Sequence, residues 1–300
     1  MADSFFEISA RERIAGLVDE GSFTEWLPPQ ARLSSPHMPL LDQPVAFDDG
    51  VVIGKALLNG EPVYLAAQEG DFLGGAVGEV HGAKITAMIR KAVADKIGTV
   101  LLVFESGGVR LHEANAGLVA VSEIMRALLA ARVAGVRFIG LVGGAAGCFG
   151  GTGLISRCCD VLIMSEEGRL SMSGPEVIET VHGVEEFDSR DRALVWRVTG
   201  GKNRYVLGEV DALVADQVGA FRQAAIACMN QGKPAGLNLQ DIEAEHAMLA
   251  RRLQTFDQCN DGAEIWQQLG MGDINTLAMM PAAQFAAQFE KARSKAMGGV

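Results

Sequence analysis

Residues 136–164, VRFIGLVGGAAGCFGGTGLISRCCDVLIM, contain two apolar runs separated by a glycine-rich segment and a short helical pattern. The runs at 136–142 and 161–164 are continuously apolar, as is typical of strands that are buried on both faces. A third such run, at 100–104, precedes them and is followed by a helical pattern over residues 113–132. Strands that alternate with helices favour βαβ crossovers, so the sequence predicts an α/β fold with parallel strands.

Toward the N-terminus, the pattern is different. Residues 9–20 predict a helix that Ser9 caps, with Glu12 three positions later as in a capping box and Gly21 as a stop. Residues 27–44 hold five prolines, which predicts an extended loop.

Two β-rich runs follow this loop, and after the alternating region the chain becomes helical. The runs, residues 51–58 and 62–68, are separated by Asn59-Gly60, which predicts a hairpin. From about residue 216 the pattern is helical to the end. We therefore expect three parts: an N-terminal helix and proline-rich loop (1–50), an α/β core (51–215) and a C-terminal helical extension (216–300).

The composition excludes several classes of protein. Twenty-six basic against 37 acidic residues give a net charge of −11, opposite in sign to a typical nucleic-acid or anionic-membrane binder. The five cysteines form no C-x-x-C pair, which argues against a zinc site or a disulfide framework. The start has no signal-peptide pattern, and no apolar run reaches about 18 residues. We expect a cytoplasmic protein with no membrane or nucleic-acid partner and no metal.

Familiar catalytic motifs are absent from the sequence. There is no P-loop, no G-x-G-x-x-G after a strand with a later acid, no G-x-S-x-G and no H-E-x-x-H. The histidines have no ligand spacing, so we expect surface or capping positions for each of them: His37, His81, His112, His182 and His246.

Glycines are abundant, 36 in 300 residues, and three clusters stand out by position. Gly74-Gly75 follows the hairpin, Gly107-Gly108 follows the run at 100–104, and the cluster at 143–153 follows the run at 136–142. Ligands bind at the carboxyl ends of parallel strands, and glycine there lets backbone N–H groups meet a developing negative charge. Two successive clusters are consistent with an oxyanion hole, and equally with tight turns and close helix packing.

Other polar residues in these segments have competing interpretations. Arg110 and Glu113 are spaced for an ion pair, and a substrate contact by Arg110 is the alternative. Ser106 is expected to order its turn rather than act as a nucleophile. Cys158-Cys159 are expected to pack in the interior, and Glu176, after Pro175, to lie at a helix start.

Five segments, in this order over residues 9–181, resemble acyl-CoA carboxyltransferase subunits. They are SARERIAGLVDEGSFTEW (9–26), FLGGAVGEVHGAKI (72–85), SGGVRLHEA (106–114), GGAAGCFGGTGLISRCCDVLIM (143–164) and GRLSMSGPEVIET (168–180). The third is similar to the S-G-G-A-R-x-x-E motif of the acetyl-CoA carboxylase carboxyltransferase β subunit. The resemblance implies a crotonase-type ββα spiral fold and chemistry on acyl thioesters.

Two departures narrow the resemblance. No cysteine precedes Cys148, so the four-cysteine zinc ribbon of the acetyl-CoA carboxylase subunit is missing, and Glu176 stands where that family has Arg after G-P. A chain of this kind with a helical C-terminal part most resembles the β subunit of biotin-independent malonate decarboxylase. That family implies a γ subunit as partner and a malonyl thioester on an acyl carrier protein with a CoA-like prosthetic group as substrate.

The resemblance implies a role for particular residues. We expect decarboxylation to the acetyl thioester and CO2, with backbone N–H donors from Gly107 or Gly108 and from Gly150 or Gly151. Substrate contacts are expected from Arg110, Gly74, Gly75 and Gly147, and this chain is expected to bind no cofactor itself. The alternatives are a carboxyltransferase β-type subunit of a biotin-dependent acyl-CoA carboxylase and a non-catalytic assembly subunit.

Overall fold

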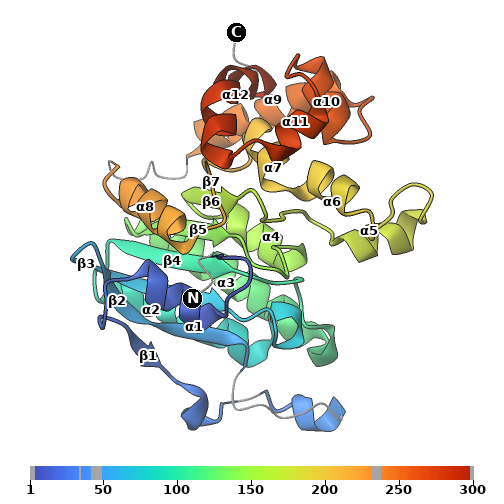
Figure 1. Ribbon diagram of the computed structural model, residues 1–300. Helices are drawn as coiled ribbons and strands as arrows, with labels where there is room; N and C mark the ends of the chain where they lie inside the picture. The colour runs from blue at the N-terminus through green and yellow to red at the C-terminus, as the bar shows by residue number, and fades with distance from the viewer. Residues whose placement is uncertain (1–3, 34, 42–48, 232–237, 298–300) are drawn as a thin grey trace.

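The computed structural model describes residues 4–33, 35–41, 49–231 and 238–297 (Figure 1). A seven-stranded sheet lies at its centre, with the strands in chain order. The first three strands are antiparallel, and β3 to β7 run parallel, which confirms the predicted α/β fold. The strands are β1 (Thr24–Trp26), β2 (Val51–Leu58), β3 (Glu61–Gln68), β4 (Thr99–Phe104), β5 (Arg137–Val142), β6 (Val161–Ser165) and β7 (Ala212–Val214).

The predicted hairpin is present between β2 and β3. Asn59 and Gly60 have φ values of 52° and 80°, the positive values that a two-residue type I′ turn requires at both central positions. Asp19 accepts hydrogen bonds from both of these backbone N–H groups, at 3.0 and 2.7 Å. The turn is therefore specified by its own sequence and held by a carboxylate from the N-terminal segment.

Helices cover both faces of the sheet because the strand residues alternate between them. Leu102 and Phe104 face the core that contains α2 (Glu79–Ala94), α3 (Asn115–Val133) and α4 (Gly150–Arg157). Leu101 and Val103 face the opposite core, which is closed by α1 (Ala10–Leu17) and α8 (Val218–Met229). Helix α8 therefore packs in the same layer as α1, although it lies beyond the expected boundary at residue 216.

The helices after residue 238 gather beyond β7, and those at residues 175–199 extend to one side of the molecule (Figure 1). Their aromatic residues Trp266, Phe285 and Phe289 belong to the same core cluster as the sheet. The C-terminal part is thus joined to the core by a shared apolar interior. The remaining helices are α5 (Pro175–His182), α6 (Arg192–Thr199), α7 (Gly201–Val206), α9 (Leu239–Phe256), α10 (Gly262–Gln268), α11 (Ile274–Met279) and α12 (Ala282–Ala296).

The N-terminal region agrees with the sequence in its helix and differs in its loop. Ser9 and Glu12 form the predicted capping box, and α1 ends at Leu17, before Gly21. The proline-rich stretch holds two short 3-10 helices, Pro29–Ala31 and Met38–Leu41, in place of a wholly extended chain, because proline fixes φ at a value that suits such turns. Residues 34 and 42–44 of that stretch lie outside the described residues.

Candidate active site

Three loops at the carboxyl edge of the sheet carry the glycine clusters, and short backbone bridges join them. Ser106, after β4, pairs with Cys148, after β5, and Cys148 pairs in turn with Leu170, after β6. Val109 pairs with Val77, which follows the first cluster. The loops therefore form a second, smaller layer of parallel strands, which sets the distance between the clusters.

The structure brings the second and third clusters into contact. A methyl group built on Gly108 would lie 3.2 Å from Gly150 Cα and 3.1 Å from Phe149 O. Gly108 and Gly150 also have φ values of 122° and 56°, in the region that favours glycine. Side chains at these two positions would push the loops apart, so the close approach depends on glycine at both.

The backbone N–H groups of these glycines have different partners. Gly151 is the second residue of α4, where a helix supplies no acceptor, and no acceptor for its N–H is found among the described residues. The other three N–H groups are bonded within the protein: Gly107 to Gly74 O at 2.8 Å, Gly108 to Ser106 Oγ at 3.0 Å and Gly150 to Met172 O at 2.9 Å.

A donor that the sequence did not indicate lies in the first of these loops. Val77 N–H donates to Gly108 O at 2.8 Å and Arg110 N–H donates to Val77 O at 2.9 Å, so the N–H of Val109 points away from Val77. In the described part of the chain it has no acceptor. The Val109 side chain lies 3.0 Å from a methyl group built on Gly151. The only sequence signal for Val109 is its place directly after the glycine pair.

Gly74, Gly75 and Gly147 surround the same loops. Gly74 O accepts from Gly107 N–H, and Gly147 O accepts from Ser106 N–H at 2.7 Å. A methyl group on Gly75 would lie 1.8 Å from Glu105 O. Gly75 therefore permits the loops to pack backbone against backbone, and the contact of all three glycines with substrate stays a prediction.

Ser106 orders its turn, as the sequence indicated. Its side chain is fully buried, and its Oγ accepts from Gly108 N–H and, at 2.9 Å, from Thr152 Oγ1. Thr152 comes from α4, so this hydroxyl pair fixes the β4 loop to the start of that helix. The role of Thr152 could not be predicted, because nothing in the sequence places α4 beside Ser106.

Arg110 forms the expected ion pair with Glu113, at 3.0 Å, and only 2 % of its side chain is exposed. Its Nη2 donates to Asp49 O at 2.9 Å and to Ala76 O at 3.0 Å. The guanidinium is therefore engaged with protein groups, and the geometry favours the structural interpretation of Arg110. Its contact with substrate stays a prediction.

His81 does not lie at the surface or cap a helix, in contrast to the prediction for the histidines. It is fully buried, and its ring lies 3.1 Å from Gln68 Nε2 and 3.3 Å from Asp49 O. Burial, helped by the charges of Arg110 and Lys84, lowers the pKa of His81 to about 3, so the imidazole is neutral. Its hydrogen-bond partners come from distant segments and make its burial favourable, so no local sequence pattern could indicate it.

Cys158 and Cys159 are half-buried and pack against the main core, and Cys148 is fully buried. Burial raises the pKa of all three thiols, that of Cys148 to about 12, so none is an activated thiolate. Glu176 lies in the first turn of α5 directly after Pro175, the position expected for it. No group of three metal-ligating side chains occurs in the described ranges. No described helix has the length and apolar character needed to cross a membrane.

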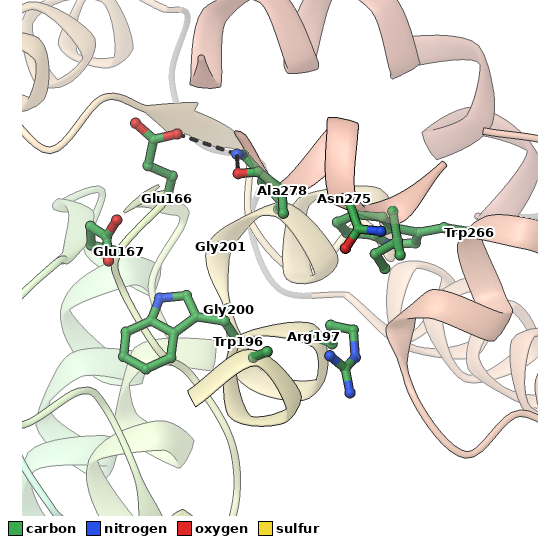
Figure 2. Close-up of a pocket in the computed structure, with 12 residues that line it drawn as sticks. Glu166, Glu167, Trp196, Arg197, Gly200, Gly201, Trp266, Asn275 and Ala278 are labelled. Carbon is green, nitrogen blue, oxygen red and sulfur yellow. Dashed lines mark hydrogen bonds and ion pairs between the residues drawn. The ribbon is translucent and has the colours of Figure 1, made fainter. Parts of the chain in front are cut away.

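A cavity of about 200 Å³ lies at the carboxyl end of β6, the strand next to β5 in the sheet (Figure 2). Glu166 and Glu167, which follow β6, form one side of it, and α6, α7, α10 and α11 supply the rest together with Gly200, which joins α6 to α7. Lys202 pairs with Glu166 at 3.4 Å, and burial raises the pKa of Glu167, with Asp216 and Glu166 adding to the effect. The lining includes none of the eight predicted site residues, so this cavity is separate from the glycine loops.

Comparison with known proteins agrees with this geometry. A family model described as a carboxyl transferase domain matches residues 7–203. Malonyl-S-ACP:biotin-protein carboxyltransferase MADC of Malonomonas rubra is 38 % identical over 97 % of both chains. The acetyl-coenzyme A carboxylase carboxyl transferase subunit beta of Fusobacterium nucleatum is 32 % identical over 58 % of this chain and 59 % of its own.

Solved structures show the same relation. A chain of a Pseudomonas malonate decarboxylase hetero-tetramer, in complex with malonate, matches with a TM-score of 0.80 and 38 % identity, covering 88 % of this chain and 96 % of that one. A chain of the Pseudomonas MdcD-MdcE hetero-dimer matches with a TM-score of 0.68 and 35 % identity, covering 83 % and 97 %.

The chain belongs to the carboxyl transferase family, and its crotonase-like α/β fold is confirmed. Within that family it is a near full-length relative of malonate decarboxylase subunits, as the motifs between residues 9 and 181 indicated.

Proposed function

We propose that this chain is the β-type subunit of a malonate decarboxylase and releases CO2 from a malonyl thioester carried on an acyl carrier protein. The observation that carries the proposal is the contact between Gly108 and Gly150, which brings the start of α4 against the loop after β4. The malonate decarboxylase and malonyl-S-ACP names of the relatives support the substrate class.

The chemistry requires stabilisation of an enolate. Breaking the bond between the carboxylate carbon and the α-carbon leaves the electron pair on the thioester, with negative charge on its oxygen. Hydrogen-bond donors fixed at that oxygen stabilise the transition state more than the ground state. CO2 leaves, and a proton then reaches the α-carbon to give the acetyl thioester.

The proposed donors are backbone N–H groups from the two glycine loops. Gly151 N–H supplies one, aided by the positive end of the α4 dipole. The second comes from the loop of Gly107 and Gly108. Among the described residues the N–H of Val109 has no acceptor, whereas the N–H groups of both glycines donate to other protein groups. Gly107, Gly108 and Gly150 then act chiefly by allowing the close approach.

The active unit of the proposal is heteromeric and needs no biotin. The related Pseudomonas structures are a hetero-tetramer and a hetero-dimer, which supports a heteromeric active unit. A γ-type subunit is therefore the proposed partner, together with the acyl carrier protein and its CoA-like prosthetic group.

A second candidate function is transfer of the carboxyl group to a biotin protein. The name of the Malonomonas relative, a malonyl-S-ACP:biotin-protein carboxyltransferase, favours it. Both reactions pass through the same enolate, so the glycine loops serve either one.

The test is CO2 release from malonyl thioester by the chain purified with its partner subunit, with and without avidin and a biotin carrier protein. We expect release without biotin, no effect of avidin, and little activity from the isolated chain. Release that depends on the biotin protein identifies the second function. A complex with neither activity indicates an assembly subunit.

A further inference from the structure

Glu105 is a buried acid beside the glycine loops that the proposed reaction does not use. It follows β4 directly and precedes Ser106, and its side chain is 6 % exposed. It forms an ion pair with Arg13 of α1, whose side chain is 1 % exposed. We propose that the Arg13–Glu105 pair is a positioning device that holds the two glycine loops at the separation the oxyanion hole requires. This inference rests on the proposed function of those loops.

The Glu105 side chain touches the loops on both sides of its own. Its Oε1 accepts from Ala146 N–H, in the loop after β5, at 3.2 Å. Methyl groups built on Gly70 and on Gly144 would each lie 2.5 Å from Glu105 Cδ. The carboxyl group therefore fills a slot between the loops after β3 and β5, and glycine on each side leaves just enough room for it.

The backbone of Glu105 belongs to the same arrangement. Its N–H donates to Gln68 Oε1 at the end of β3, at 3.2 Å, and its carbonyl oxygen lies against Gly75. Ser106, the next residue, orders Gly108. A shift of Glu105 therefore moves the adjacent Ser106, whose side chain holds the glycine pair after β4. The same shift moves the loop that ends at Gly150, through the hydrogen bond from Ala146.

Arg13 is held as firmly as its partner. Its Nε donates to Phe5 O at 2.8 Å and its Nη2 to Phe6 O at 3.3 Å. The ring of Phe5 lies under the guanidinium and stacks on Phe221 of α8, with ring centroids 3.9 Å apart. The cation therefore has a single position, and a fixed cation gives the carboxylate a fixed position.

The charge matters for the geometry as well as for stability. Charge-assisted hydrogen bonds are shorter and stronger than neutral ones, so the ionised pair draws Glu105 toward α1. Replacing the Glu105 carboxylate by an amide leaves the buried guanidinium of Arg13 without its counter-charge. The attraction that draws residue 105 toward α1 is then lost. Displacement of catalytic groups by about 1 Å costs on the order of 10²-fold in rate.

The test uses Glu105→Gln in the complete heteromeric complex, with Asp160→Asn as the matched control. Asp160 is a buried carboxylate that pairs with Arg132 at 2.6 Å and lies before β6, at the amino edge of the sheet. We expect Glu105→Gln to lower kcat by roughly 10- to 10²-fold with KM within about twofold. Asp160→Asn should lower Tm and leave kcat unchanged.

The double variant Arg13→Met with Glu105→Gln distinguishes positioning from separate structural effects. If the two residues act as one device, the loss in kcat should be about that of either single variant. Additive losses, or a fall in Tm with unchanged kcat per folded molecule, overturn the proposal.

A readout independent of activity completes the test. Amide hydrogen exchange should rise in residues 105–111 and 143–151 of Glu105→Gln and Arg13→Met, and stay unchanged there in Asp160→Asn. Unchanged exchange in the first two variants also overturns the inference. A wild-type complex that neither releases CO2 nor transfers it contradicts the proposed function alone, since the exchange result still decides the role of the ion pair.

Discussion

Gly150 combines a positive φ with contact to a neighbouring loop. Its φ is 56°, and a methyl group there would lie 3.2 Å from Gly108 Cα. A branched side chain at this position strains the turn and moves the first turn of α4, which carries the open N–H of Gly151. A substitution of Gly150 is therefore the most direct test of the proposed oxyanion hole.

We expect Gly150→Val to lower turnover by about 10²–10³-fold, the usual cost of losing one such donor, with a smaller change in substrate affinity. Steady-state kinetics of the heteromeric complex provides the measurement. Gly135→Val is the matched control, because Gly135 also has a positive φ, 90°, with nothing near it. It should lose stability and keep its turnover, and a fully active, folded Gly150→Val contradicts the proposal.

His81 makes the stability of the protein depend on pH. Its pKa is about 3 in the folded chain, against about 6.5 when exposed, so the unfolded chain binds the proton more readily. The stabilisation is complete above about pH 6.5 and is lost as the pH falls toward 3. Between pH 7 and pH 5 the loss should be about 2 kcal/mol.

Urea unfolding at pH 7 and pH 5 measures this effect. His81→Gln should remove about 2 kcal/mol of the pH dependence, whereas His112→Gln, at an exposed residue, should retain it. Equal pH dependence in the two variants would show that His81 is accessible to protons in the folded chain.

At the scale of the elements, α1 shows how a short helix is specified. Its eight residues are few for an isolated helix, and the capping box satisfies two backbone donors at its start: Ser9 N–H donates to Glu12 Oε2 at 2.9 Å, and Glu12 N–H to Ser9 Oγ at 3.4 Å. The remaining stabilisation comes from packing on the sheet.

Ser9→Ala should lower the free energy of unfolding by about 1 kcal/mol, because the bond from Glu12 N–H to the serine hydroxyl and the bond from that hydroxyl to Glu12 Oε2, at 2.7 Å, are both lost. Thermal or urea unfolding is the measurement. Ser122→Ala is the control, since Ser122 is an exposed residue within α3. A Ser9→Ala variant as stable as the wild type would mean that packing alone fixes the start of α1.

At the scale of the whole molecule, the C-terminal helices and the sheet share one interior. Phe285 of α12 is fully buried, and its ring lies 5.5 Å from Trp266 and 5.0 Å from Phe289. The same core cluster includes Leu213 of β7. The helices after residue 238 therefore contribute to the stability of the sheet that carries the site.

Phe285→Ala should destabilise the whole chain by about 3–5 kcal/mol in a single unfolding transition, because it opens a cavity in the common core. Met279→Ala, at a residue that is 85 % exposed, is the control and should have little effect. Two separate transitions in the Phe285→Ala variant, with the sheet unaffected, would indicate an independent C-terminal unit.

The sequence by itself determined the elements whose signals are local. The capping box of Ser9 and Glu12, the Asn59-Gly60 turn and the apolar runs of β4, β5 and β6 each lie within a few consecutive residues. Propensity and burial act there over the same short range, so the pattern predicts the structure. The glycine clusters could be placed at the carboxyl ends of strands because the apolar runs show where those strands end.

Only the tertiary structure decided which distant groups meet. The bond from Thr152 to Ser106, the burial of His81 and the Arg13–Glu105 pair join residues between 13 and 92 positions apart. Short elements such as β1 and β7, of three residues each, also depend on their neighbours in the sheet. Their stabilisation comes from contacts made after the chain has folded, and the energy of such contacts leaves no periodic pattern in the sequence.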